Sequence, residues 1–270
     1  MKKIIGVVIL LLFFLGFQEL QKDSKALEFG ERNLLLTENS VHEGSLLLIN
    51  QETMLQSVEK DLAKLPEDFA ANVEINDEYL LSPIAIDSLQ KMFFEAEKDG
   101  IHHFKINSAY RNHELQQQLY EKYGADYALP AGYSEHQSGL SLDIASTQDT
   151  MDKATEGEWL ANHAHKFGFI LRYPEDKTEI TGIAFEPWHF RYVGIPHSII
   201  MKKKHFVLEE YIQFIQKKET FNFRYKGVDY VIQYAKEGEE VKVPDVEAID
   251  ISGDNLSGYI ITSILKEANK

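Results

Sequence analysis

The chain has 270 residues, of which 44% are hydrophobic and 11% aromatic, so it can bury at least one sizeable core. Its formal net charge of −15 excludes nucleic-acid binding through a broad basic surface and argues against peripheral attachment to anionic lipid. The absence of cysteine excludes disulfides, cysteine nucleophiles and thiolate metal sites. Any metal ion must therefore be held by histidine, aspartate and glutamate.

The N-terminal segment predicts export from the cytoplasm. Lys2 and Lys3 precede an unbroken apolar run from Ile4 to Phe17. A basic start followed by a short apolar run is typical of a secretory signal peptide, and the run is shorter than the roughly 20 residues of a spanning helix. Residues 1–26 are therefore predicted to be a signal peptide or, if uncleaved, an N-terminal anchor, which would be the only attachment to a membrane.

The next segments predict a tether and then a folded domain. Residues 27–44 are polar and lack a clear period, which favours a tether. Residues 45–197 alternate between short apolar runs and amphipathic stretches, beginning with an apolar run at 45–50 that predicts a buried strand. Ser82 and Pro83 are typical of the first residues of a helix, and Gly100 is typical of its end.

The remaining periodic segments of this domain favour an α+β fold. They predict helices at 112–123 and 156–167, and strands at 104–108, 140–144, 169–173 and 188–193. Helices and strands mix without a βαβ rhythm, so we expect a small mixed or antiparallel sheet flanked by helices. From about Ser198 a helix leads into strands within 225–234 and 258–264, so residues 198–270 are predicted to form a small strand-rich extension without catalytic residues.

The loop at 130–139 and the strand after it carry the first chemical pattern. His136 lies seven residues before Asp143, with Gly139 between them to allow a tight turn. In the strand, Ser141 and Asp143 share one face because side chains alternate with period two. A histidine that folds back beside a strand aspartate offers imidazole and carboxylate, which suit zinc when thiolates are absent.

A second pattern, Glu186-Pro-Trp-His189, supplies another imidazole and a carboxylate three residues before it. A catalytic zinc takes three protein ligands and leaves a fourth position open, and a nearby carboxylate can accept a proton from water. Taken singly, each residue has an ordinary interpretation: a hydrogen-bonded core histidine, a turn aspartate or a solvated glutamate. The ordered combination of loop histidine, strand aspartate and Glu-x-x-His favours a metallopeptidase site.

The combined pattern resembles the VanY-type D,D-carboxypeptidases, a zinc peptidase group that also includes D,D-dipeptidases and L,D-carboxypeptidases. The family pattern S-x-H-x-x-G-x-[AS]-x-D is matched by Ser134, His136, Gly139, Ser141 and Asp143. The later pattern E-x-W-H is matched by Glu186, Trp188 and His189. The upstream pattern S-[AG]-Y-R…Q is matched by Ser108, Ala109, Tyr110, Arg111 and Gln116. Segments 167–173 and 189–194 also match the family's usual sequence. The resemblance covers roughly residues 45–197.

The resemblance implies one zinc ion per chain, held by His136, Asp143 and His189, with Glu186 as general base and then general acid. The implied fold is α+β with this single zinc site. The implied reaction removes the terminal D-alanine of a peptidoglycan stem peptide or its precursor. Such an enzyme would act outside the cytoplasm, secreted or anchored at the bacterial cell envelope.

Substrate contacts and alternatives follow from the same resemblance. Arg111 would polarise the scissile carbonyl and stabilise its oxyanion, or hold the terminal carboxylate, and both tasks suit a fixed guanidinium. Ser134 and Gln116 would orient the end of the substrate. A structural salt bridge is the alternative role of Arg111. Two alternative functions remain open, an L,D-carboxypeptidase acting on tetrapeptide stems and a cell-wall-binding module with a degenerate site.

Overall fold

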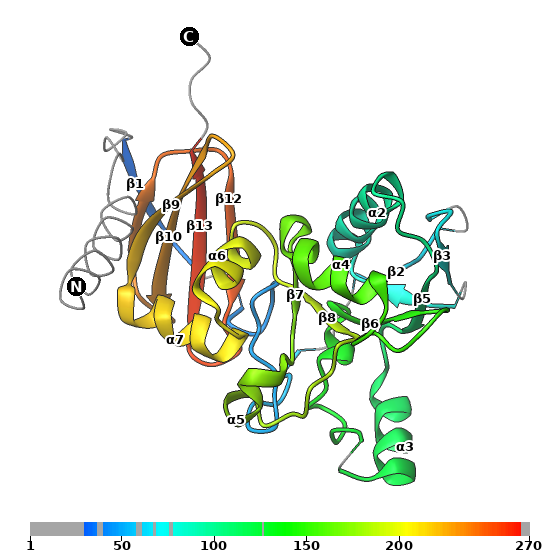
Figure 1. Ribbon diagram of the computed structural model, residues 1–270. Coiled ribbons are helices and arrows are strands. Elements are labelled where there is room, and N and C mark those ends of the chain that lie inside the picture. Colours follow the sequence, from blue (N-terminus) through cyan, green and yellow to red (C-terminus); the bar gives the residue numbers. More distant parts are fainter. Residues whose placement is uncertain are drawn as a thin grey trace, which may run out of the picture.

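The computed structural model describes residues 30–36, 40–57, 61–66, 69–75, 78–125 and 127–265. The predicted signal segment at 1–26 lies outside these residues. Across the described ranges, none of the helices combines the length and apolar character needed to cross a membrane. Figure 1 shows two neighbouring sheets, one beside the helices α2 (Pro83–Lys98) and α4 (Thr155–His163), and the other beside α6 (His197–Lys204) and α7 (Leu208–Lys218).

The first sheet is mixed and has five strands in the order β3-β5-β6-β8-β7. Its strands are β3 (Val73–Glu74), β5 (Phe104–Ser108), β6 (Ser141–Ser146), β7 (Phe169–Leu171) and β8 (His189–Tyr192). Only the β3–β5 pair is parallel. A separate small sheet pairs β2 (Ala63–Lys64) with β4 (Leu80–Leu81). This arrangement confirms the predicted α+β class.

The helices begin and end largely at the residues that the sequence indicates. They are α2 (Pro83–Lys98), α3 (His113–Tyr123), α4 (Thr155–His163), α5 (Thr178–Thr181), α6 (His197–Lys204) and α7 (Leu208–Lys218), with 3-10 turns η1 (Glu135–Ser138), η2 (Ala164–Phe167) and η3 (Glu175–Lys177). Asn112 caps α3 by accepting a hydrogen bond from the amide of Leu115. The predicted helix at 156–167 is confirmed as α4 continued by η2.

Two hydrophobic clusters bury the faces of these elements. In the first, Leu89 and Phe93 of α2 pack with Phe104, Leu142 and Phe190 of the five-stranded sheet. The second cluster joins the two parts of the chain, because it includes Leu46, Ile170 and Val193 together with residues of α6, α7 and the second sheet. The C-terminal part therefore buries apolar surface of the sheet that carries the predicted site.

The second sheet has the strand order β12-β13-β10-β9. Its strands are β9 (Thr220–Tyr225), β10 (Val228–Lys236), β12 (Ile249–Gly253) and β13 (Gly258–Leu265), and a two-stranded pair joins β1 (Glu31–Leu34) to β11 (Val241–Pro244). The expected strand at 225–234 begins instead after a turn at Lys226 and Gly227, which both have positive φ. The helix expected from about Ser198 is divided in two, because His205 adopts the left-handed conformation. Part of the expected tether, β1, is a strand.

The prediction of a strand at 45–50 is wrong. This segment is buried, with Leu46 and Ile49 fully inaccessible, but it belongs to none of the described sheets. Its polar backbone groups are satisfied by isolated bonds, because the Leu46 amide donates to Ser252 Oγ and Arg191 donates to the Leu47 carbonyl. An apolar run shows that a segment is buried and leaves open whether it pairs with a neighbouring strand.

Replacing Gly157 with alanine is expected to destabilise the protein. Alanine normally stabilises a helix interior relative to glycine by roughly 0.5–1 kcal/mol. In α4, however, a Cβ at this position would overlap the carbonyl oxygen of Met151. Overpacking of this kind costs about 1–3 kcal/mol, so thermal unfolding should show a lower Tm. The exposed neighbour Glu158→Ala serves as the control, and an unchanged or raised Tm for Gly157→Ala would contradict the packing argument.

Candidate active site

Adjacent strands bring the predicted residues together. Asp143 on β6 lies directly opposite His189 on β8 in the antiparallel register. His136 comes from η1, and Gly139 ends this turn in the left-handed conformation, so the chain reverses into β6. A histidine from the turn and a histidine from the neighbouring strand therefore meet at one strand carboxylate.

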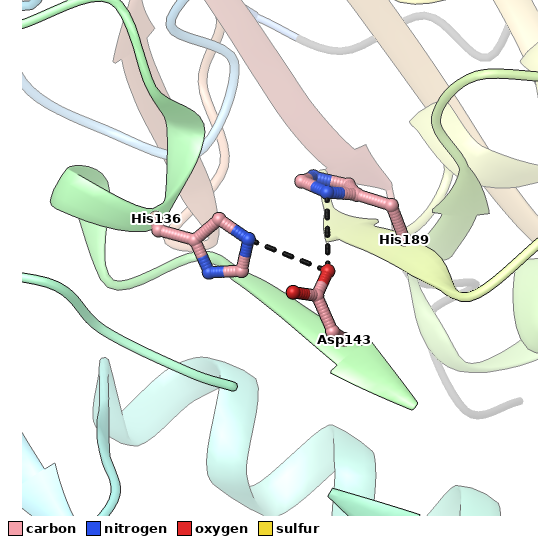
Figure 2. Close-up of side chains that lie close together, drawn as sticks. All are labelled: His136, Asp143 and His189. Atoms are coloured by element: carbon pink, nitrogen blue, oxygen red, sulfur yellow. Dashed lines mark ion pairs between the residues drawn. The ribbon is translucent and has the colours of Figure 1, made fainter. Parts of the chain in front are cut away.

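Figure 2 shows both imidazole rings directed at the same carboxylate oxygen. Nε2 of His136 lies 3.4 Å from Asp143 Oδ1, and Nδ1 of His189 lies 3.3 Å from the same atom. Both imidazoles are buried, and the Asp143 side chain is 16% exposed. In the described part of the chain, this trio is the only group of three or more His, Asp or Glu side chains close enough to hold a metal ion.

The donor atoms of this trio fit a zinc ion. Nδ1 of His136 lies 2.7 Å from the Ala109 carbonyl oxygen, which fixes the ring proton there and leaves the Nε2 lone pair facing Asp143. Asp143 Oδ1 is buried and lacks a conventional hydrogen bond within the described residues. A cation between these atoms, either a proton or a metal ion, relieves the repulsion between facing lone pairs. Ligands about 2.0–2.1 Å from a tetrahedral zinc lie about 3.3–3.4 Å apart, close to the observed separations.

Burial and the neighbouring charges set the protonation of the trio without metal. Burial lowers the pKa of His136. Burial opposes ionisation of Asp143 as well, but the two histidines outweigh it and hold the Asp143 pKa well below its usual range. Burial by itself would lower the His189 pKa, but the Asp143 and Glu135 carboxylates outweigh this effect and raise the pKa to about 9. The Asp143 carboxylate is therefore ionised and ready to bind a cation.

Glu186 lies beside the trio without being at its centre. Its amide donates to the Tyr173 carbonyl, and its own carbonyl accepts from the His189 amide, so a tight turn sets the carboxylate against the histidine. Glu186 Oε2 lies 3.4 Å from His189 Nδ1. Burial raises the Glu186 pKa above its ordinary value. A carboxyl group with a raised pKa is suited to accepting and returning a proton near neutral pH.

The other predicted residues lie around the same cavity of about 450 Å³, which the trio and Glu186 also line. Arg111 donates to Asp143 Oδ2 at 2.9 Å, to Ser108 Oγ at 2.9 Å and to Gln116 Oε1 at 3.3 Å. Gln116 is tied to the Leu129 carbonyl. The guanidinium therefore forms a salt bridge here and also borders the cavity, while Ser134 lies in its wall.

Sequence reasoning missed the residues that lie behind the trio. Glu135, Arg172 and Arg191 are fully buried and joined by ion pairs of 2.8 Å. Their sequence signal was a charged residue inside each of two apolar strand segments, at 169–173 and 188–193. A buried charge requires a buried partner, so these arginines could have been expected to meet a carboxylate. Tyr127, Tyr173 and Trp188 also line the cavity and had no predicted role.

Known proteins are similar to this chain in sequence. Residues 78–195 match the profile of the VanY family, described as D-alanyl-D-alanine carboxypeptidase. A D-alanyl-D-alanine carboxypeptidase of Enterococcus faecium is 46% identical over 235 residues, which cover 84% of this chain and 77% of that protein. A second, from Enterococcus faecalis, is 33% identical over 67% of this chain and 72% of its own length.

Solved structures are also similar to this chain. The vancomycin resistance D,D-dipeptidase VanXYg, in complex with a D-Ala-D-Ala phosphinate analogue, has a TM-score of 0.75 and 30% identity, and the match covers 87% of this chain and 98% of that one. A VanY D,D-pentapeptidase variant from a VanB-type resistance cassette, in complex with Zn(II), has a TM-score of 0.53 and 31% identity, covering 62% of this chain and 98% of its own. From its sequence, its fold and the arrangement of its site, the chain belongs to the VanY family of D-alanyl-D-alanine carboxypeptidases.

Proposed function

We propose that this chain is a zinc-dependent D,D-carboxypeptidase that removes the terminal D-alanine from peptidoglycan stem peptides. The observation that carries the proposal is the meeting of His136, Asp143 and His189 at one point of a cavity, with Glu186 beside them. The 46% identity to a D-alanyl-D-alanine carboxypeptidase supports this substrate class. A binding module with a degenerate site is disfavoured, because each catalytic position holds a competent residue.

In this proposal His136, Asp143 and His189 hold one zinc ion per chain. Zinc bound there supplies a Lewis acid that activates water and polarises the scissile carbonyl. Glu186 accepts the proton of the attacking water and passes it to the departing amine of D-alanine, a role supported by its raised pKa and its position.

Arg111, Gln116 and Ser134 are proposed to bind and orient the C-terminal end of the substrate. Arg111 has donors at the cavity wall, and a guanidinium can bind a carboxylate or a developing oxyanion. Its salt bridge with Asp143 and its bond to Gln116 hold it in place next to the scissile position. Arg111 thereby also orients a metal ligand.

Blocking the terminal carboxylate of the substrate is expected to slow cleavage. A free carboxylate near the scissile bond is a fixed negative charge that Arg111 or Ser134 can bind. An amide leaves those donors poorly paired, which costs about 1–3 kcal/mol and lowers kcat/KM by about 5- to 160-fold. Mass spectrometry of free and amidated pentapeptides measures the effect. Equal cleavage of both would reject exopeptidase action, and preferential release of D-alanine from a tetrapeptide would assign the enzyme to the L,D-carboxypeptidases.

We further infer that residues 45–197 form the catalytic domain, that 198–270 form an extension and that the enzyme works outside the cytoplasm. The basic and apolar N-terminal segment supports export. A substrate in the cell wall is reachable only from that side. Cell fractionation tests the location, and a wholly cytosolic protein would contradict it.

A further inference from the structure

A chain of buried charges connects helix α7 to the metal trio. Arg172 donates to both carboxylate oxygens of Glu209 on α7, at 2.7 and 2.9 Å. Through its Nε, Arg172 also donates to Glu135 Oε1 at 2.8 Å. The Arg172 and Glu135 side chains are inaccessible, and that of Glu209 is 9% exposed. One guanidinium therefore holds two carboxylates from different parts of the fold.

Glu135 carries the connection on to the site. Its second oxygen, Oε2, lies 3.4 Å from Nε2 of His189 and accepts a hydrogen bond from Ser141 Oγ at 3.1 Å. The opposite ring nitrogen of His189, Nδ1, faces Asp143. A carboxylate beside the outer nitrogen of a metal-binding histidine fixes the ring orientation and its tautomer.

We propose that Glu209 is a positioning residue for the metal site, acting through Arg172 and Glu135 on the imidazole of His189. This inference rests on the proposed function, because it takes His189 as a zinc ligand. Glu209 comes from the part of the chain that the sequence indicates to be a non-catalytic extension. The extension thereby contributes to the geometry of the site as well as to the shared hydrophobic core.

The physical reason lies in how Arg172 distributes its donors. Glu209 takes both terminal nitrogens, so Arg172 binds Glu135 through Nε alone and at Oε1 alone. Oε2 is left for Ser141 and His189. Without the Glu209 carboxylate, the freed donors of a buried guanidinium need another acceptor, and a two-point pair with Glu135 is the nearest arrangement. That pair would take Oε2 away from His189.

Charge balance points the same way. The buried network contains two carboxylates, Glu135 and Glu209, and two guanidinium groups, Arg172 and Arg191. Removing one carboxylate leaves an unbalanced buried positive charge close to the cation site. Such a charge opposes metal binding in addition to disturbing the ring of His189.

The test measures zinc affinity by competition with a chromophoric chelator, together with the visible spectrum of the cobalt-substituted protein. Glu209→Gln removes the charge and keeps the shape. Arg172→Lys keeps the charge balance but cannot bind both carboxylates as a planar fork does. Both variants are expected to weaken zinc binding by about 10-fold and to shift the cobalt spectrum. This is the lower end of the roughly 10- to 100-fold loss of metal affinity that follows when a partner of a metal ligand is removed. Glu209→Asp, which keeps the negative charge, should retain most of the wild-type affinity for zinc.

Glu210→Gln is the matched control. Glu210 is the next residue of α7, is partly exposed and pairs with Lys177 at 2.9 Å. This variant should bind zinc within about twofold of the wild type. Wild-type affinity and spectrum in the folded Glu209→Gln or Arg172→Lys protein would overturn the proposal. Equal weakening in Glu210→Gln would also overturn it, because loosening of α7 would then explain the effect.

The same measurements separate this inference from the proposed function. If the wild-type protein binds no zinc, or if His189→Ala binds it as well as the wild type, the proposed metal site is wrong. If the wild type binds one zinc ion that His189→Ala loses, while Glu209→Gln and Arg172→Lys behave as the wild type, only the positioning role of Glu209 is wrong.

Discussion

Glu186→Gln is expected to lower kcat by about 10²- to 10⁴-fold while leaving zinc content and fold unchanged. The substitution removes the group that accepts and returns the proton and keeps the size of the side chain. Glu186 is placed for this task by its distance of 3.4 Å from His189 and by burial, which raises its pKa. Release of D-alanine from a pentapeptide gives kcat, and metal analysis gives the zinc content.

The exposed Glu175→Gln provides the control for this variant, because it makes the same substitution in a nearby turn. It should retain wild-type turnover. A Glu186→Gln enzyme with near-normal kcat would show that another base moves the proton. Loss of zinc together with activity would instead make Glu186 a participant in metal binding.

Alanine at any of the three proposed ligands is expected to abolish stoichiometric zinc binding and, with it, turnover. His136, Asp143 and His189 each direct one atom at the same point, and a site with two remaining ligands binds zinc far more weakly. Zinc content after dialysis and the rate of D-alanine release measure the two effects. His205→Ala, which removes an exposed imidazole paired with Asp176, is the control.

The outcome for Asp143 needs a second variant, because this carboxylate also binds Arg111. Asp143→Asn keeps the side-chain volume and removes the charge, which separates loss of the ligand from a collapsed cavity. Full zinc retention in all three alanine variants would reject the proposed coordination. Retention in one of them would remove that residue alone from the ligand set.

Local patterns in the sequence were enough to predict many of the elements. Ser82 and Pro83 indicated the start of α2 and Gly100 indicated its end, because helix caps depend on residues within one turn. The apolar run at 45–50 correctly indicates burial, but the segment does not pair with a strand. Its partners, Ser252 and Arg191, lie far away in the chain and satisfy the backbone without a sheet.

The sequence by itself indicated the class of the fold and the candidate site residues, because short-range periodicity and the two short motifs, His136 to Asp143 and Glu186 to His189, are each local features. Only the tertiary structure decided how these residues meet. The β6–β8 register sets Asp143 opposite His189, and the ion pairs Glu135–Arg172 and Arg172–Glu209 each join residues 37 positions apart. Such long-range pairing depends on which buried charges the folded chain brings within reach of one another, and no local pattern specifies it.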